Sequence, residues 1–169
     1  MDAAYGIVVY TDGCCLGNNR KTGRSGGVGV VFPSYPQYNI GEYYDDNITN
    51  NRAELYAILR SLEIIDVSID PFNMKSVCIK TDSQLCVNAL TKWMKSWKRN
   101  GWKLSTGEPP SNMDILKKIN THMDKRRCTF IHVRGHRTDA SIDTYYNTMA
   151  DALANRGAAA GSTQSVASA

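Results

Sequence analysis

The chain has 169 residues, of which 21% are charged and 42% hydrophobic, and a net charge of +4, a composition typical of one ordinary globular domain. No apolar run reaches the ~18 residues of a membrane span, and the N-terminus lacks the features of a signal or transit peptide. Five cysteines without C-x-x-C spacing argue against zinc and against a disulfide framework, so we expect free thiols in an intracellular compartment, cytoplasmic or nuclear.

The first part of the chain predicts three strands and then a helix. Residues 5–10 are a β-prone run, and residues 25–32 predict a second strand whose glycines allow close approach of another backbone. Residues 37–44 predict a tyrosine-rich third strand, so the sheet is expected to begin with antiparallel hairpins. A helix is then expected from Thr49 or Asn50, because both are good N-cap residues and the apolar residues that follow recur at helical spacing through Ile65.

The second part predicts strands that alternate with helices. A fourth strand around residues 77–79 ends at Thr81 and Asp82, a short basic helix covers 91–99, and a further helix contains 115–123. A fifth strand is expected at 129–133 and a last helix at 144–157. The pattern predicts an α/β fold with a five-stranded mixed sheet flanked by helices, forming one domain over residues 1–157. Residues 158–169 contain almost no bulky apolar side chains, so we expect a disordered tail.

Four acidic residues stand where a carboxylate would not be expected on structural grounds alone. Asp12 and Asp82 each follow an apolar run and a threonine, so they are predicted at the ends of two strands. Glu54 and Asp151 lie among apolar neighbours on helices, where a carboxylate is costly unless a cation compensates it. Each acid alone has the alternative of a cap or turn residue. Together they favour a divalent metal site with oxygen ligands, which suits Mg²⁺ or Mn²⁺.

At this point the sequence resembles a known family. The segments TDGCC at 11–15, TNNRAEL at 49–55, TDS at 81–83 and VRGH at 133–136, followed by Ala150-Asp151, are similar in order and spacing to type 1 ribonuclease H. The similarity extends from residue 5 to about residue 157. It implies the ribonuclease H-like fold and an endonuclease that hydrolyses the RNA strand of RNA–DNA hybrids, leaving 5′-phosphate and 3′-hydroxyl ends.

The resemblance also implies roles for individual residues. Two Mg²⁺ ions, for which Mn²⁺ can substitute, would be held by the four carboxylates of Asp12, Glu54, Asp82 and Asp151. His136 would exchange a proton near the leaving 3′-oxygen, as an imidazole can near neutral pH. The stretch from His136 to Asp151 is longer than the family usually has, which affects how His136 is placed.

A basic, tryptophan-rich segment lies between Asp82 and Glu108. It carries five lysines and arginines and no acidic residue, which leaves 15 basic and 16 acidic residues in the rest of the chain. Trp93 and Trp97 are four residues apart and share a helix face, which fits either core packing or a nucleic-acid surface. The segment is similar to the basic protrusion of eukaryotic type 1 enzymes, which holds the DNA strand and is typically absent from retroviral domains.

The same resemblance implies further contacts with a hybrid duplex. Ser105 would join the DNA channel, and Thr49 and Asn112 a DNA phosphate pocket. The residues expected to face the RNA strand are Cys15, Asn18, Asn50 and Asn51, since short polar groups near 2′-hydroxyls distinguish RNA from DNA. For Cys15, strand packing is an equally open alternative. The expected partner is therefore the hybrid itself, with no membrane and no obligate protein partner, and the protein is expected to be a monomer.

Three other interpretations remain open. A DNA-cutting nuclease or transposase of the same fold would have no use for residues that face 2′-hydroxyls. A hybrid-binding module without catalysis would gain nothing from four acids that repel phosphate. The third is a fragment of a reverse transcriptase. The methionine just before the first strand and the polar tail argue against it and suggest an autonomous protein. Incubating labelled RNA–DNA, RNA–RNA and DNA–DNA duplexes with Mg²⁺ or EDTA distinguishes these interpretations.

Overall fold

The computed structural model describes residues 6–17, 24–46 and 48–167. Its five strands form one mixed sheet in the order β3-β2-β1-β4-β5. β1, β2 and β3 are joined by antiparallel pairing, whereas β4 pairs parallel with both β1 and β5. The predicted five-stranded mixed sheet is confirmed. The strands are β1 (Ile7–Leu16), β2 (Ser25–Val31), β3 (Ile40–Tyr44), β4 (Val77–Thr81) and β5 (Cys128–His132).

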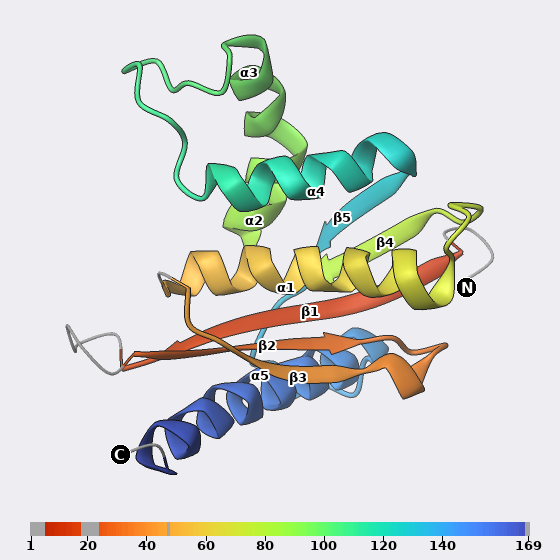
Figure 1. The fold of residues 1–169 in the computed structure, drawn as a ribbon. Coiled ribbons are helices and arrows are strands. Elements are labelled where there is room, and N and C mark those ends of the chain that lie inside the picture. Colours follow the sequence, from red (N-terminus) through yellow and green to blue (C-terminus); the bar gives the residue numbers. More distant parts are fainter. Residues whose placement is uncertain (1–5, 18–23, 47, 168–169) are drawn as a thin grey trace.

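Helices cover both faces of this sheet (Figure 1). On one face lie α1 (Asn50–Ile64), α2 (Gln84–Asn88) and α4 (Met113–Lys125), and on the other lies α5 (Ile142–Ala167). α3 (Met94–Arg99) and the loop after it project away from the sheet (Figure 1). Shorter turns complete the chain: η2 (Pro36–Tyr38), and the π-helical turns η3 (Ile65–Ile69) and η4 (Ala89–Trp93), which continue α1 and α2.

The main hydrophobic core lies between the sheet and the helices α1, α2 and α4. Alternate residues of the central strands point into it, as the two-residue period of a strand requires. Each large aliphatic side chain that is fully buried stabilises the fold by about 1.5–3 kcal/mol relative to an exposed one. The side chains from β1, β2 and β4 are Ile7, Val9, Val30, Val77 and Ile79, and those from the helices include Leu55, Ile58, Leu62, Leu90, Leu116 and Ile119.

α5 approaches β2 unusually closely because β2 carries glycines on that face. A Cβ atom on Gly29 would lie 2.0 Å from the carbonyl oxygen of Ala150, and one on Gly27 would lie 1.9 Å from that of Ala154. Only a residue without a side chain allows this contact between backbones. The close packing determines where α5, and therefore Asp151, sits over the sheet.

The prediction of a disordered tail from residue 158 is wrong, because α5 continues through Ala167. Ala158 is completely buried, and the backbone of Gly157 lies against β3, where a Cβ would come within 2.4 Å of the carbonyl oxygen of Glu42. The small residues that suggested disorder instead let the helix run close to the sheet.

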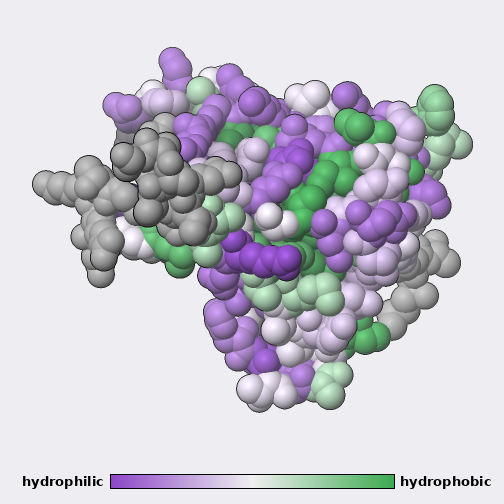
Figure 2. All heavy atoms as spheres, turned by 60° about the horizontal axis from the view of Figure 1, so that its bottom comes forward, coloured by the Kyte–Doolittle hydropathy of each residue, from purple (hydrophilic) through white to green (hydrophobic). Residues whose placement is uncertain are grey.

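Viewed toward the face on which α5 lies, hydrophobic areas of the surface lie between hydrophilic ones and do not form one continuous apolar surface (Figure 2).

Candidate active site

Three carboxylates from three different elements meet beside the centre of the sheet. Asp12 comes from β1, Glu54 from α1, and Asp82 from the residue just after β4. One oxygen atom from each lies within 4.8 Å of the corresponding oxygens of the other two. Among the described residues this is the one group of acids, cysteines and histidines with spacing suited to a metal ion. These residues are 42 and 28 positions apart along the chain, so only the fold brings them together.

The two strands bring Asp12 and Asp82 together in different ways. Asp82 lies at the carboxyl end of β4, as predicted. Asp12 does not lie at a strand end: β1 continues to Leu16, because its antiparallel pairing with β2 extends to the partners Leu16 and Ser25. The parallel pairing of β1 with β4 does stop at Thr11 and Thr81, so both aspartates directly follow the last paired residues of that ladder.

Glu54 reaches the cluster from the fifth residue of α1. The predicted N-cap is confirmed at Thr49, whose side-chain oxygen accepts a hydrogen bond of 3.0 Å from the backbone N–H of Arg52. Glu54 Oε2 is buried and has no hydrogen-bond partner among the described residues. A buried carboxylate oxygen left without a donor is costly, and a bound cation would remove that cost. The donor set therefore fits a hard divalent cation.

The electrostatics of the cluster point the same way. Burial, followed by the nearby carboxylates of Glu54 and Asp82, raises the pKa of Asp12 far above its usual range. Burial and the charge of Asp82 likewise raise the pKa of Glu54, and burial raises that of Asp82. Like charges this close cannot all ionise unless a positive charge joins them. The raised pKa values favour protonated carboxyl groups at this site, and added positive charge would favour their anionic forms.

Asp151 and His136 lie at the edge of the cluster. Both line a pocket of about 270 Å³ that also contains Asp82, and Asp151 contributes to the raised pKa of Asp12. Asp151 is not one of the three carboxylates with metal-ligand spacing, so it is the outermost of the predicted four. His136 is exposed and has a left-handed backbone with φ of 54°. Burial raises the pKa of Asp82, and the nearby His136 opposes that rise in part.

Two residues at this site were not predicted. Asn147 is 4% exposed and lines the same pocket, one helical turn before Asp151 on α5. That four-residue spacing is visible in the sequence and could have indicated it. The second residue is His132, whose Nε2 lies 3.2 Å from the backbone carbonyl oxygen of Asp82 and so helps to hold that turn. No sequence signal distinguishes this contact, because it joins two strands.

The residues predicted to bind DNA phosphate meet around a buried arginine. Arg52, 6% exposed, is joined to Thr49 through the N-cap and donates a hydrogen bond of 3.2 Å to Asn112 Oδ1. Its guanidinium also pairs with Asp46 at 2.8 Å and Asp114 at 2.7 Å. The structure thus brings Thr49 and Asn112 together.

The other predicted nucleic-acid residues are more dispersed. Asn50 and Asn51 lie in the first turn of α1, and Asn51 Oδ1 accepts a bond from the Cys86 thiol at 3.4 Å. Cys15 is 8% exposed on β1, which limits what it can offer to a ligand. Ser105 is exposed in the loop after α3, and Asn18 lies outside the described residues.

Trp93 and Trp97, two of the three tryptophans of the basic segment, differ in their surroundings. Trp93 is 39% exposed, whereas Trp97 is partly buried and packs against the main core. Their ring centres are 6.3 Å apart, so the rings contact each other. Trp97 therefore packs on the core, whereas a nucleic-acid contact of Trp93 stays a prediction.

The fold and the carboxylate cluster define a protein of the ribonuclease H-like class. The solution structure of the prototype foamy virus (PFV) RNase H domain superimposes on 92% of this chain and 96% of its own, with a TM-score of 0.72 and 25% identity. The sequence profile of the RNase H family matches residues 4–159. The chain belongs to the RNase H family.

Individual relatives agree with this assignment. The chain is 38% identical over 141 residues to the probable ribonuclease H of Acanthamoeba polyphaga mimivirus, covering 83% of this chain and 61% of that protein. It is 35% identical over 152 residues to the ribonuclease H of Ruthia magnifica, covering 88% of this chain and 92% of that protein. It spans half the length of the mouse and human ribonuclease H1 proteins that it also resembles. No helix in the described part of the chain is long and apolar enough to cross a membrane.

Proposed function

We propose that this protein is an endonuclease that hydrolyses the RNA strand of RNA–DNA hybrids, leaving 5′-phosphate and 3′-hydroxyl ends. One catalytic domain within residues 1–157 would carry the activity. The observation on which the proposal rests is the buried cluster of Asp12, Glu54 and Asp82, with an unpartnered oxygen on Glu54. A protein that only bound hybrids would keep three mutually repelling carboxylates to no advantage. Membership in the RNase H family supports the same activity.

The cluster would hold two Mg²⁺ ions, for which Mn²⁺ can substitute, with Asp151 as the fourth ligand residue. When bound, such ions activate water and stabilise the charge that develops on the leaving oxygen. The raised pKa values of Asp12, Glu54 and Asp82 support this, because carboxylates that resist ionising together are stabilised by added positive charge. The side chains themselves set the spacing of the carboxylates.

His136 would exchange a proton at the leaving 3′-oxygen. Its imidazole stands at the rim of the pocket that contains Asp82 and Asp151, exposed to solvent and to an incoming phosphate. Histidine is the side chain best suited to exchanging a proton near neutral pH. General acid help of this kind is worth roughly 10²–10⁴-fold in rate. Asn147, buried in the same pocket, would orient groups around Asp151.

The hybrid would be gripped at three places. Thr49 and Asn112, joined by Arg52, would take a phosphate of the DNA strand. Trp93, Trp97 and Ser105 would hold the same strand further along, as the basic protrusion of the eukaryotic-type enzymes does, and the exposure of Trp93 beside several lysines supports this. Facing the RNA strand would be Cys15, Asn18, Asn50 and Asn51.

We further propose that the protein acts as a monomer inside the cell, in the cytoplasm or the nucleus. The five cysteines are all unpaired, and thiols persist in a reducing compartment.

The test is cleavage of RNA–DNA, RNA–RNA and DNA–DNA duplexes labelled on either strand, with Mg²⁺, Mn²⁺ or EDTA. We expect cleavage of the RNA strand of the hybrid alone, dependent on the metal, with 5′-phosphate ends on the products. Asp12→Asn is the inactive control, and Asp124→Asn, which changes an exposed acid on α4, is the matched active one. Cutting of the DNA strand, or hybrid binding without any cleavage, would overturn the proposal.

A further inference from the structure

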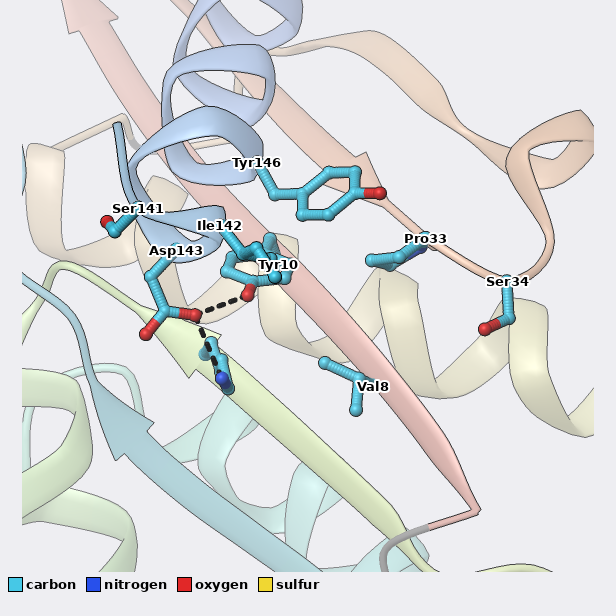
Figure 3. Close-up of a pocket in the computed structure, with 9 residues that line it drawn as sticks. Val8, Tyr10, Pro33, Ser34, Ser141, Ile142, Asp143 and Tyr146 are labelled. Atoms are coloured by element: carbon cyan, nitrogen blue, oxygen red, sulfur yellow. Dashed lines mark hydrogen bonds and ion pairs between the residues drawn. The ribbon is translucent and has the colours of Figure 1, made fainter. Parts of the chain in front are cut away.

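The long stretch between His136 and Asp151 ends in a hydrogen-bonded contact with the sheet. Asp143, in the first turn of α5, accepts hydrogen bonds on one carboxylate oxygen from the Tyr10 hydroxyl and, at 2.9 Å, from Lys80 Nζ. Figure 3 shows the Asp143 side chain extending from α5 toward Tyr10. Tyr10 is 2% exposed and the Lys80 side chain is 22% exposed, whereas the Asp143 side chain is 45% exposed, so the contact is sheltered from water only on the side of the sheet.

The position of this contact relates it to the active site. Tyr10 and Lys80 are direct partners in the parallel pairing of β1 with β4. Each precedes an acid of the carboxylate cluster, Asp12 or Asp82, by two residues. The contact therefore ties the start of α5 to the two strands that deliver those aspartates.

Polar and aromatic contacts together join the start of α5 to the sheet at this point, because the rings of Tyr10 and Tyr146 also lie 5.2 Å apart. Tyr10, Lys80 and Asp143 line a pocket of about 500 Å³ between the start of α5 and the end of β2, with Val8 and Pro33 on its other side (Figure 3). Further along, the backbone of α5 lies directly on Gly29. The body of the helix, with Asp151, is thus held by contacts of its own. The three residues Tyr10, Lys80 and Asp143, called the triad below, hold only the first turn of α5.

The loop before α5 is itself stiffened. Arg137 pairs with Asp139 at 2.7 Å, and Asp139 accepts hydrogen bonds from the backbone N–H of Ser141 and the hydroxyl of Thr144. Ser141 Oγ accepts from the backbone N–H of Thr144 at 3.1 Å, which caps the helix. The loop is therefore joined to the N-cap of α5 by hydrogen bonds, and the first turn of α5 is joined to the sheet through Asp143.

We infer that Tyr10, Lys80 and Asp143 are positioning residues that hold the loop carrying His136 over the carboxylate cluster. The inference rests on the role proposed above for His136. Residues between His136 and Asp151 supply both the cap and the anchor of this loop. Loss of the triad should release the loop and leave the metal ligands in place.

The kinetic test is a double-mutant cycle between Asp143→Ala and His136→Ala, read as single-turnover cleavage of one hybrid. We expect Asp143→Ala to lower the rate at least about tenfold, and the double variant to be no slower than His136→Ala alone. The Mg²⁺ concentration for half-maximal rate should not change. Asp143→Asn, which keeps a neutral acceptor, should recover part of the rate. Glu42→Ala, which removes a comparable ion pair between Glu42 on β3 and Arg60 on α1, is the control with parent rate.

A second readout does not depend on activity. Arg134 and Arg137 are exposed trypsin sites in the loop, so Asp143→Ala should speed cleavage there, whereas Glu42→Ala should not. Parent-like cleavage of the loop, multiplicative effects of the two mutations, or a raised Mg²⁺ requirement would each overturn the inference. A parent protein that cuts no hybrid would overturn the proposed function, and the trypsin result would still decide whether the triad holds the loop.

Discussion

Gly13 of β1 lies directly against the backbone of Ala53 at the start of α1. A Cβ atom on residue 13 would come within 2.3 Å of the carbonyl carbon of Ala53 and 2.4 Å of the backbone nitrogen of Glu54. No side chain fits between strand and helix here. This contact is what lets Asp12 and Glu54, on neighbouring residues of the two elements, share one site.

Gly13→Ala should therefore move α1 away from β1. Overpacking of this kind costs about 1–3 kcal/mol of unfolding free energy, and the added methyl meets backbone, which yields less readily than side chains. We expect a lower melting temperature together with weaker Mg²⁺ binding, measured by calorimetric titration. A variant with parent stability and parent Mg²⁺ affinity would show that the two elements separate without cost.

Asp12→Asn and Asp82→Asn should each abolish Mg²⁺-dependent cleavage without unfolding the protein. Each removes a negative ligand but also a repulsion between buried carboxylates, so the stability of the metal-free protein should hold or increase. Melting curves in EDTA, beside cleavage assays in Mg²⁺, separate the two effects. A metal-free variant that melts far below the parent would make the residue structural.

The metal-free protein should lose stability as pH rises from about 4 through neutrality. The pKa values of Asp12, Glu54 and Asp82 are raised in the folded protein, so over this range the folded state binds more protons than the unfolded state. The unfolding free energy then falls by about 1.4 kcal/mol per pH unit for each excess proton. The lowered pKa of Asp114, about 2, acts only below this window.

Denaturant titrations in EDTA at several pH values measure this slope. Mg²⁺ should flatten it, because bound metal replaces the protons. Asp12→Asn should flatten it as well, by removing one of the proton-binding groups. A stability that rises with pH in EDTA would contradict the prediction.

Replacing Trp93 and replacing Trp97 should have different effects on hybrid binding and stability. Trp93→Ala should weaken hybrid binding by about 1–3 kcal/mol, the usual value of a base–aromatic stack, with a smaller change in melting temperature than Trp97→Ala, since Trp93 is 39% exposed. Trp97→Ala should lower the melting temperature as well, because Trp97 packs on the core. Fluorescence titrations with a labelled hybrid and melting curves measure both. Unchanged binding by a folded Trp93→Ala protein would exclude a stacking role.

The sequence alone determined where the strands and main helices lie and which acidic residues are candidates for a metal site. Apolar periodicity located all five strands and the main helices, and four acids in apolar surroundings indicated a metal site before any coordinates were known. These are local signals, because a side chain that must be buried on one face leaves its period in the sequence. The motif order added the family, which the sequence profile confirms.

Only the tertiary structure decided how far the elements extend and which residues meet. β1 continues past Asp12 because β2 pairs with it, and α5 continues past Gly157 because β3 offers a surface close enough for small residues. Asp143 reaches Tyr10 across 133 positions of sequence. Register, close backbone contacts and hydrogen bonds across the sheet depend on partners far along the chain, and no local pattern of residues records them.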